Sequence, residues 1–308
     1  MSDSGAFLKD KIKDGEVRMK ETKVYKQVND CSISADIYYQ GAGSPVIIYI
    51  HGGALIFGSR LWLSAEQIKF FTQAGFSVVN IDYRLAPETA FEQIVEDIRD
   101  AIAWVRTKAV EWYDFDISNI AVMGGSAGGY LSLLTGTMGI KPKAIVSFYG
   151  YGDILGDWLA RSSDFYCRKP LINRMKALAS VGQKQTTDGD WERFNFYLYC
   201  RQQGVWLQEV TGMDRDNDIQ ALSRFIPIQN ITEDYPPTLL LHGDQDTDVP
   251  YEQSVLMYEK LQERGISSDL ITIEGADHVF DQHFHQPAVQ NAFVKVAAFL
   301  KTHLSKEL

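Results

Sequence analysis

A serine among glycines, in the stretch AVMGGSAGGY at 121–130, has the residue types and spacing of an activated nucleophile. The stretch GGSAG at 124–128 matches the pattern G-x-S-x-G and lies between an apolar run and a helix-like run. On a strained corner between a strand and a helix, the hydroxyl of Ser126 would project above the strand ends at a helix N-terminus. Glycines two residues away would let the neighbouring elements approach. The alternative is a tight turn without chemistry.

A serine needs a base and an orienting acid to act as a nucleophile. His278, in EGADHVF, follows the last strand we expect, and Asp244, Asp246 and Asp248 follow the preceding strand in HGDQDTDVP. Loops after parallel strands gather at one edge of a sheet, so any of the three acids could reach His278. Their alternation resembles the start of a calcium loop, but glycine is missing at the sixth position, so we expect no metal.

The remaining histidines fit other roles better. His242 ends the strand before the acids, and we expect it to orient their loop. His283 and His285 lie in a polar stretch, where we expect surface positions, and His303 lies on the final helix, where we expect it to be solvated.

A second group of glycines suggests an oxyanion hole, a set of backbone N–H groups that bind the negative charge of an acyl-transfer intermediate. The stretch YIHGGALIFG at 49–58 follows an apolar run and contains Gly52 and Gly53. Without Cβ atoms, these glycines could present their N–H groups to a substrate carbonyl, together with the N–H of Ala127. The alternative is a flexible turn.

These motifs together resemble a known family. The stretches IHGGA at 50–54, DYRLAPE at 82–88 and GGSAGG at 124–129 resemble the hormone-sensitive-lipase-like esterases of the α/β-hydrolase superfamily. The resemblance covers roughly residues 45–150. HGDQDTDVP is similar to the H-G-x-x-D-x-x-V-P acid loop of other superfamily members, and that similarity selects Asp246 as the triad acid.

The sequence also departs from the family's pattern. Ala54 stands where the family has a third oxyanion-loop glycine, and Gly125 stands where it usually has aspartate before the nucleophile. The resemblance implies that Asp82, Tyr83 and Arg84 are structural residues that buttress the oxyanion loop.

Strands alternate with helices through most of the chain, as expected for a doubly wound, mostly parallel sheet. The pattern predicts strands at 17–28, 31–39, 45–50, 76–83, 119–123, 143–150, 237–242 and 267–273. It predicts helices at 63–74, 91–113, 130–138, 251–264 and 286–304. We therefore expect an α/β fold of the α/β-hydrolase type.

One segment interrupts this alternation and predicts the domain organisation. Residues 1–152 and 229–308 would form the core, and 153–228 would form a helical cap or lid. The run WERFNFYLY at 191–199 is rich in aromatic residues, and Trp191, Phe194 and Phe196 are candidates for an acyl-pocket wall. The alternative is that these aromatic side chains only build the insertion's own core.

Composition excludes several classes of protein. The 308-residue chain carries a net charge of −10, which argues against a general nucleic-acid binder. Cys31, Cys167 and Cys200 form no C-x-x-C pair, so we expect neither a disulfide framework nor a zinc site. The first twenty residues lack the apolar run of a secretion signal and no stretch is long enough to span a membrane, so we expect a cytoplasmic protein.

The sequence thus predicts a serine hydrolase of small to medium acyl esters, with Ser126, His278 and Asp246 as its triad. The reaction would pass through an acyl-enzyme without metal or organic cofactor. The alternatives are an amidase, formamidase or peptidase with the same triad, and a non-catalytic small-molecule receptor on the same scaffold. The natural substrate and the oligomeric state remain open.

Overall fold

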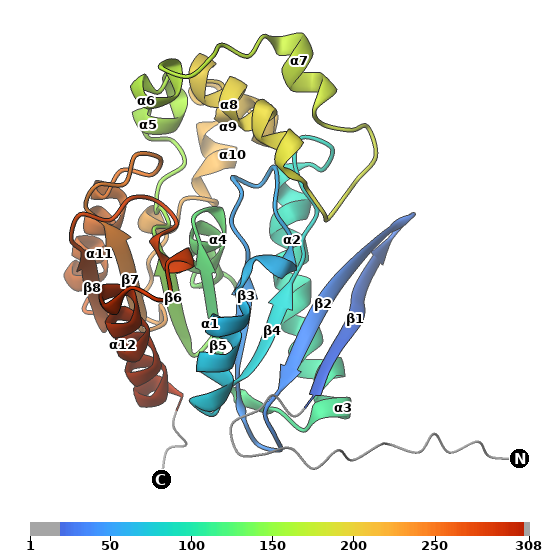
Figure 1. Ribbon diagram of the computed structural model, residues 1–308, viewed down its shortest axis with the longest axis vertical. Coiled ribbons are helices and arrows are strands. Elements are labelled where there is room, and N and C mark those ends of the chain that lie inside the picture. Colours follow the sequence, from blue (N-terminus) through green and yellow to red (C-terminus); the bar gives the residue numbers. More distant parts are fainter. Residues whose placement is uncertain (1–18, 305–308) are drawn as a thin grey trace, which may run out of the picture.

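The computed structural model describes residues 19–304, in which eight strands form one sheet in the order β1-β2-β4-β3-β5-β6-β7-β8 (Figure 1). The strands are β1 (Met19–Val28), β2 (Cys31–Tyr39), β3 (Pro45–Ile50), β4 (Ser77–Ile81), β5 (Asp116–Gly125), β6 (Ala144–Phe148), β7 (Thr238–Gly243) and β8 (Ser268–Ile273). The β1–β2 and β2–β4 pairings are antiparallel, and every other pairing is parallel. The doubly wound, mostly parallel sheet is therefore confirmed.

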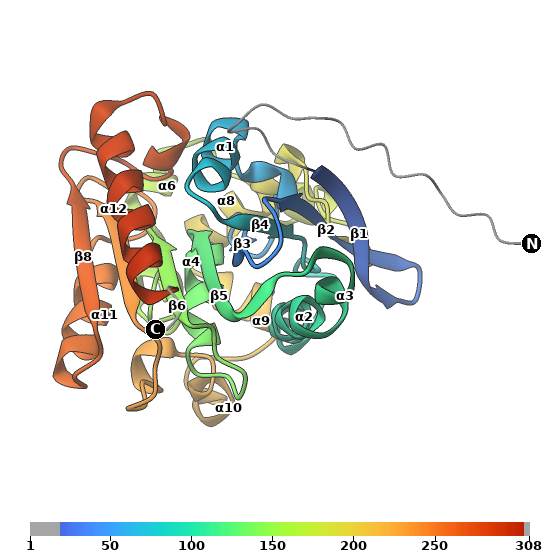
Figure 2. The same ribbon diagram turned by 90° about the horizontal axis from the view of Figure 1, so that it is seen from below.

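Helices cover both faces of the sheet (Figure 2). They are α1 (Ala65–Gln73), α2 (Phe91–Trp104), α3 (Val110–Tyr113), α4 (Ala127–Thr135), α5 (Asp157–Ala160), α6 (Asp164–Cys167), α7 (Arg174–Ala179), α8 (Phe194–Gln203), α9 (Trp206–Thr211), α10 (Ile219–Ser223), α11 (Glu252–Glu263) and α12 (Pro287–His303). Short turns are η1 (Arg60–Trp62), η2 (Val105–Ala109), η3 (Trp191–Arg193), η4 (Pro227–Gln229) and η5 (Phe280–Gln282).

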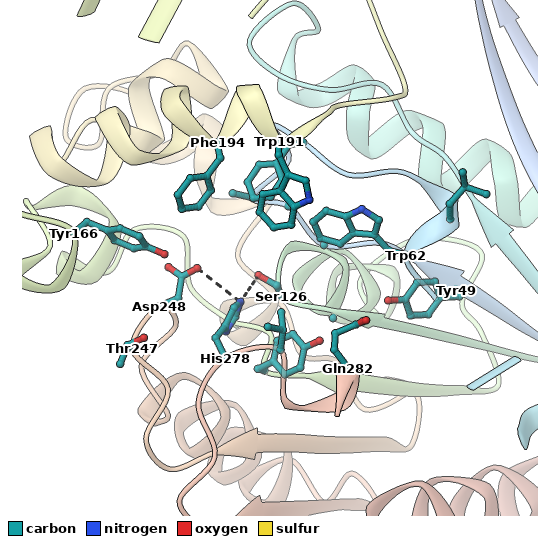
Figure 3. Close-up of a pocket in the computed structure, with 18 residues that line it drawn as sticks. Tyr49, Trp62, Ser126, Tyr166, Trp191, Phe194, Thr247, Asp248, His278 and Gln282 are labelled. Carbon is teal, nitrogen blue, oxygen red and sulfur yellow. Dashed lines mark hydrogen bonds and ion pairs between the residues drawn. The ribbon is translucent and has the colours of Figure 1, made fainter. Parts of the chain in front are cut away.

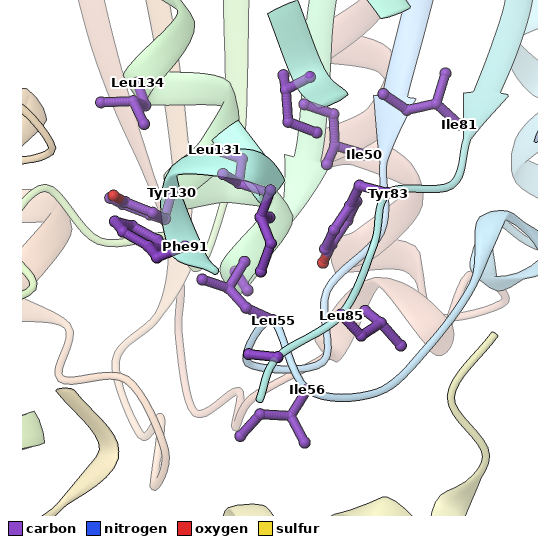
Figure 4. Close-up of a cluster of buried hydrophobic side chains, with 14 of the residues drawn as sticks. Ile50, Leu55, Ile56, Ile81, Tyr83, Leu85, Phe91, Tyr130, Leu131 and Leu134 are labelled. Carbon is purple, nitrogen blue, oxygen red and sulfur yellow. The ribbon is translucent and has the colours of Figure 1, made fainter. Parts of the chain in front are cut away.

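Alternate residues of the central strands enter two separate cores. Ile48 of β3 and Val122 of β5 pack with α2 and α4, whereas Tyr49 and Met123 pack with α1 and α12. Figure 4 shows the first of these clusters, around Ile50 and Tyr130 among others. Burial on both faces explains why these strands read as continuous apolar runs.

The predicted elements match the observed ones with shifted ends. Residues 17–18 of the first predicted strand, and most of the stretch used to exclude a secretion signal, lie outside the described residues. The predicted helix at 91–113 is interrupted by the π-helical turn η2. Helix α4 begins at Ala127 rather than at residue 130, so two glycines lie in its first turn. All three cysteines are free.

Segment 153–228 lies above the carboxyl ends of the parallel strands and carries α5 to α10 (Figure 1). Arg193 ties this segment to the loops that follow β3 and β4. The buried guanidinium pairs with Glu88, with Nη2 2.6 Å from Oε2, and its Nε donates to the carbonyl of Ile56 at 2.6 Å. Gly58 and Gly189 also exchange two backbone hydrogen bonds. The segment is thus attached close to the residues that follow β3.

The corner between β5 and α4 is crowded by backbone. An ideal Cβ on Gly128 would lie 2.0 Å from the carbonyl oxygen of Ile50, and one on Gly124 would lie 2.5 Å from the backbone of Gly128. These distances leave no room for any side chain. The expectation that the residues two positions from Ser126 must be small is therefore confirmed.

Within residues 19–304, no helix combines the length and apolar character needed to cross a bilayer.

Gly128→Ala should destabilise the fold, because its Cβ meets the backbone of β3, which cannot move without disturbing the sheet. We expect a loss of at least about 2 kcal/mol in the free energy of unfolding, measured by urea denaturation. Gly139→Ala is the control, since nothing lies within 4 Å of its added Cβ, and it should change stability by less than about 0.5 kcal/mol. Equal effects of the two substitutions would contradict the close-contact argument.

Candidate active site

Ser126 occupies the corner between β5 and α4 in a strained conformation, with φ 56° and ψ −122°. Positive φ is rare for a residue with a Cβ, so the surrounding structure must hold it. The N–H of Ser126 donates to the carbonyl of Phe148 at 2.9 Å, which ties the corner to β6. The side chain of Ser126 lines a cavity at this corner.

His278 lies between Ser126 and Asp246. Figure 3 shows the imidazole beside the Ser126 hydroxyl. Its Nε2 is 3.1 Å from Ser126 Oγ, and its Nδ1 is 2.7 Å from Asp246 Oδ2. A carboxylate can only accept, so Nδ1 donates to Asp246 and Nε2 is free to accept from the serine hydroxyl. The backbone N–H of His278 donates to Asp277 at 2.7 Å, which holds the loop after β8.

The side chain of Asp246 is fully buried and is held by several donors. Its Oδ1 accepts from the backbone N–H groups of Asp248 and Val249 at 2.8 and 2.9 Å, and its Oδ2 lies 3.2 Å from His242 Nε2. Burial alone would raise the pKa of Asp246, but the hydrogen bonds from His242 and His278 outweigh it and hold the pKa well below its usual range. The acid is therefore charged at neutral pH.

The interaction between Asp246 and His278 also changes the pKa of the imidazole. Burial lowers the pKa of His278, but the hydrogen bond and the charge of Asp246 outweigh burial, and Asp248 and Asp277 add to them. The pKa of His278 is therefore raised above its ordinary value. The raised pKa makes the imidazole a stronger base, and above that pKa the ring is mostly neutral and can accept the serine proton.

The other two acids of the loop have different partners. Asp244 accepts from the N–H of Gly275 at 2.7 Å, and Asp248 accepts from Tyr197 and Arg201. Neither reaches Nδ1 of His278, so the structure brings Asp246 to this nitrogen among the three candidates.

The remaining histidines mostly lie where the sequence predicts. His242 is fully buried against Asp246 and accepts from Ser254 at 2.7 Å, which fits a role in orienting the acid loop. His283 and His285 are exposed. The expectation for His303 is wrong: its ring is half-buried against Phe299, because this end of α12 still packs on the molecule.

The loop after β3, residues 51–58, surrounds the nucleophile on one side. Gly53 has φ 97°, and its carbonyl accepts from the N–H groups of Ile56 and Phe57, which closes the turn. An ideal Cβ on Gly52 would lie 2.8 Å from the carbonyl oxygen of Gly125, so only glycine fits beside the corner. The structure thus brings Gly52, Gly53 and the first residue of α4, Ala127, around Ser126.

Tyr83 supports this loop, as the resemblance implied. Its hydroxyl lies 3.0 Å from the carbonyl of His51, to which it donates, and its ring stacks on the His51 ring at 4.2 Å. Burial lowers the pKa of His51 to about 4, so the ring is neutral. Asp82 supports the loop indirectly, because its carboxylate binds the backbone N–H and the guanidinium of Arg60, which follows the loop.

Arg84 is structural, as the resemblance implied, but its hydrogen bonds go to α2 rather than to the loop 51–58. Its buried guanidinium pairs with Asp97 at 2.7 Å and donates to the carbonyl of Gln93. Arg84 therefore joins the chain after β4 to helix α2.

A cavity of about 570 Å³ opens at Ser126, and we call it the Ser126 cavity. It is lined by Tyr49, Gly52, Gly53, Ala54, Phe57, Leu61, Trp62, Gly125, Ser126, Tyr149, Tyr166, Trp191, Phe194, Thr247, Asp248, His278, Val279 and Gln282. Trp191 and Phe194 are among them, but Phe196 is fully buried in the core instead. Phe196 lies two residues from Phe194 on a helix, so the two side chains point to different faces.

Tyr149 is a site residue that the sequence did not reveal. It follows β6 with φ 37°, its ring packs against His278 at 4.7 Å, and its hydroxyl donates to buried Asp281. An ideal Cβ on Gly125 would lie 2.7 Å from the Tyr149 hydroxyl. The tyrosine thus fills the space beside the corner, which explains why the usual aspartate is replaced by glycine. A tyrosine closing a strand gives no local signal of this role.

Within residues 19–304, no group of three or more His, Cys, Asp or Glu side chains is arranged to hold a metal ion.

Comparisons with known proteins agree on the fold. The BD-FAE family model matches residues 35–261. An alpha/beta hydrolase superfamily protein from Enterococcus faecalis superposes with a TM-score of 0.71 at 24% identity, covering 92% of this chain and 99% of that one.

Two curated relatives are longer than this chain. The non-reducing polyketide synthase ausA of Emericella nidulans is 27% identical over 92% of this chain, which spans only 14% of the synthase. Esterase LipC of Mycobacterium tuberculosis is 30% identical over 77% of this chain and 53% of its own length.

Gly125→Ala should destabilise the protein by about 1–3 kcal/mol, because the new Cβ meets the Tyr149 hydroxyl. In a Tyr149→Phe background the same substitution should cost at least about 0.5 kcal/mol less, because the closest clashing atom is gone. Urea denaturation of the four proteins of this double-mutant cycle measures the difference. An equal cost in both backgrounds would show that Tyr149 does not select glycine at 125.

Proposed function

Since this chain belongs to the BD-FAE family and has the α/β-hydrolase fold, we propose that it hydrolyses carboxylic esters of small to medium acyl groups. Ser126 would be the nucleophile, His278 the general base and acid, and Asp246 the orienting acid. The match to the mycobacterial esterase supports an ester as the substrate.

One observation carries this proposal. The imidazole of His278 is hydrogen-bonded on one side to the Ser126 hydroxyl and on the other to a carboxylate without solvent exposure. Burying a charged carboxylate is expensive, and it is offset here only because several donors converge on it. A turn that merely needed glycines would not require this arrangement.

The geometry supports each step of acyl transfer. Ser126 Oγ would attack the ester carbonyl while its proton passes to His278 Nε2, and Asp246 would stabilise the imidazolium. The N–H groups of Gly53 and Ala127, with that of Gly52, would bind the oxyanion. His278 would then give the proton to the leaving alcohol, and water would cleave the acyl-enzyme by the same route. The side chains and water suffice for this reaction.

The size of the Ser126 cavity supports a preference for acyl groups of short to medium length. Its volume of about 570 Å³ is within the range of small-molecule sites, and most of its walls are aromatic or aliphatic. A short to medium acyl chain would bury its apolar surface there.

We further propose that segment 153–228 acts as a cap over the acyl site, with 1–152 and 229–308 as the core. The ring of Trp191 stacks on Trp62 with centroids 5.9 Å apart and lies 5.5 Å from Phe57. The Trp191 side chain remains 70% exposed, so it can be changed with little loss of packing. Trp191 also packs on Phe194 of its own segment, but its contacts with Trp62 and Phe57 cross to the other side of the cavity and support a role in binding.

Ser126→Ala should abolish ester hydrolysis and leave the fold intact, since it removes one oxygen. We expect kcat for p-nitrophenyl butyrate to fall roughly 10⁶-fold, and a fluorophosphonate probe to label the wild type alone.

Asp246→Asn should lower kcat on the order of 10⁴-fold, whereas the control Asp244→Asn should have a far smaller effect. Full activity in a folded Ser126→Ala protein would refute the triad, and a larger loss at Asp244 would refute the choice of acid.

Trp191→Ala should change kcat/KM unequally for p-nitrophenyl esters of two to twelve acyl carbons, because it removes one wall of the cavity. The control is Phe196→Leu, which should lower the melting temperature but scale every ester alike, since Phe196 is in the core. Assays run well below both melting temperatures separate the two effects. An unchanged acyl-length profile in Trp191→Ala would reject the cap's role in selecting the acyl group.

A further inference from the structure

Asp248 is the one carboxylate among the described residues that line the Ser126 cavity. Its Oδ1 accepts from the Tyr197 hydroxyl at 2.5 Å and from Arg201 Nη1 at 2.7 Å. Its Oδ2 lies 3.7 Å from His278 Nε2, and in Figure 3 dashed lines join this imidazole to both Asp248 and Ser126. One oxygen is thus committed to the protein, and the other faces the reacting atoms.

Arg201 holds the carboxylate in this position. The arginine side chain is only 3% exposed, and its guanidinium lies 5.3 Å from the ring centres of Trp158 and Tyr166. Nη2 of Arg201 also donates to the carbonyl of Asp248 at 3.2 Å. The pair offsets the negative charge, which weakens the attraction for a cationic substrate, but Oδ2 keeps its ability to accept a hydrogen bond.

Oδ2 of Asp248 lies close to the place that the leaving group must occupy. His278 Nε2 must give its proton to the departing atom, which therefore approaches that nitrogen to about 3 Å. At 3.7 Å from Nε2, Oδ2 is too far to bind the imidazole itself, so Nε2 stays directed at Ser126. Oδ2 is next to the place where the departing atom lies.

Esters and amides differ at that atom. The departing oxygen of an ester carries no hydrogen, whereas the departing nitrogen of a secondary amide carries one. As the nitrogen becomes tetrahedral, that N–H turns out of the amide plane and loses any partner it had. Leaving it unpaired in a closed site is costly, and a charged acceptor beside it is worth more than a neutral one.

We propose that Asp248 Oδ2 accepts a hydrogen bond from the N–H of the departing nitrogen, and that the site therefore hydrolyses amides as well as esters. This inference rests on the proposed triad. The Ser126 Oγ–C bond forms first, while the serine proton passes to His278, and the acyl C–N bond breaks when the tetrahedral intermediate collapses and His278 gives that proton to nitrogen. The N–H bound by Asp248 stays on the released amine, and Asp248 itself neither gains nor loses a proton.

The test compares p-nitrophenyl acetate with 4-nitroacetanilide, which share acyl and aryl groups and differ in the departing atom. Asp248→Asn keeps an oxygen for Tyr197 and Arg201 and places an NH₂ group where Oδ2 was. We expect the ratio of anilide to ester kcat/KM to fall about 10- to 100-fold relative to wild type. Asp244→Asn, whose carboxylate binds Gly275 outside the cavity, should leave this ratio unchanged.

Each other outcome overturns the proposal in a recognisable way. Equal losses on both substrates would show that Asp248 acts through His278 rather than on the leaving group. Anilide hydrolysis that is absent in wild type, or that survives Ser126→Ala, would refute the proposal that this site hydrolyses amides. Ester hydrolysis that survives Ser126→Ala would instead refute the proposed triad, so the two failures are distinguishable.

A second measurement covers the case in which Asp248→Asn does not fold, as judged from its melting temperature. N-methyl-4-nitroacetanilide lacks the N–H, and each rate is divided by the rate with hydroxide to remove intrinsic reactivity. Wild type should prefer the N–H anilide over the N-methyl compound by about 10-fold or more. No preference would overturn the proposal.

Discussion

The backbones of β3 and α4 meet where a Cβ on Gly128 would lie 2.0 Å from the carbonyl oxygen of Ile50. This contact lets α4 begin immediately after Ser126, and the abrupt start forces the serine into a positive φ. The same approach brings the loop 51–58 beside the corner, with Gly52 against the carbonyl of Gly125. The nucleophile and the candidate oxyanion donors are therefore positioned by one packing constraint. Neither would keep its place if side chains separated the two backbones.

Two carboxylates lie in or beside the candidate site, and each is stabilised by donors around it. Asp246 is buried with no exposure, and it is accommodated because the backbone of its own loop and two imidazoles surround it. Asp248, two residues later, is paired with Arg201 from α8. The loop after β7 thus presents two carboxylates to opposite nitrogens of His278. The first is close enough to bind Nδ1, and the second, which is paired with Arg201, lies 3.7 Å from Nε2.

Local patterns were sufficient to predict much of this arrangement. Buried parallel strands need continuous apolar runs and the corner needs glycines, so the sheet and Ser126 could be read from short stretches. The choice of Asp246 needed a resemblance, because spacing alone left three acids possible. The predictions that failed concern side chains whose positions depend on tertiary contacts. Phe194 and Phe196 look equivalent in sequence, yet helix geometry sends Phe196 to the core and Phe194 to the cavity. Tyr149 gives no local signal, since its role depends on Gly125 and Asp281 from distant elements.

The attachment of Arg193 has a consequence for how this architecture could be recombined. Its guanidinium binds Glu88 and the carbonyls of Ile56 and Ala86, all in the sheet domain. A chimaera that received a foreign 153–228 segment without an arginine at this place would leave a buried carboxylate and two carbonyls without their donors. A replacement segment would therefore need to keep this arginine, whereas stretches such as α7, which exposes Met175 to solvent, could be exchanged more freely. Changes confined to that outer edge would leave the anchored part tied to the loop beside the nucleophile.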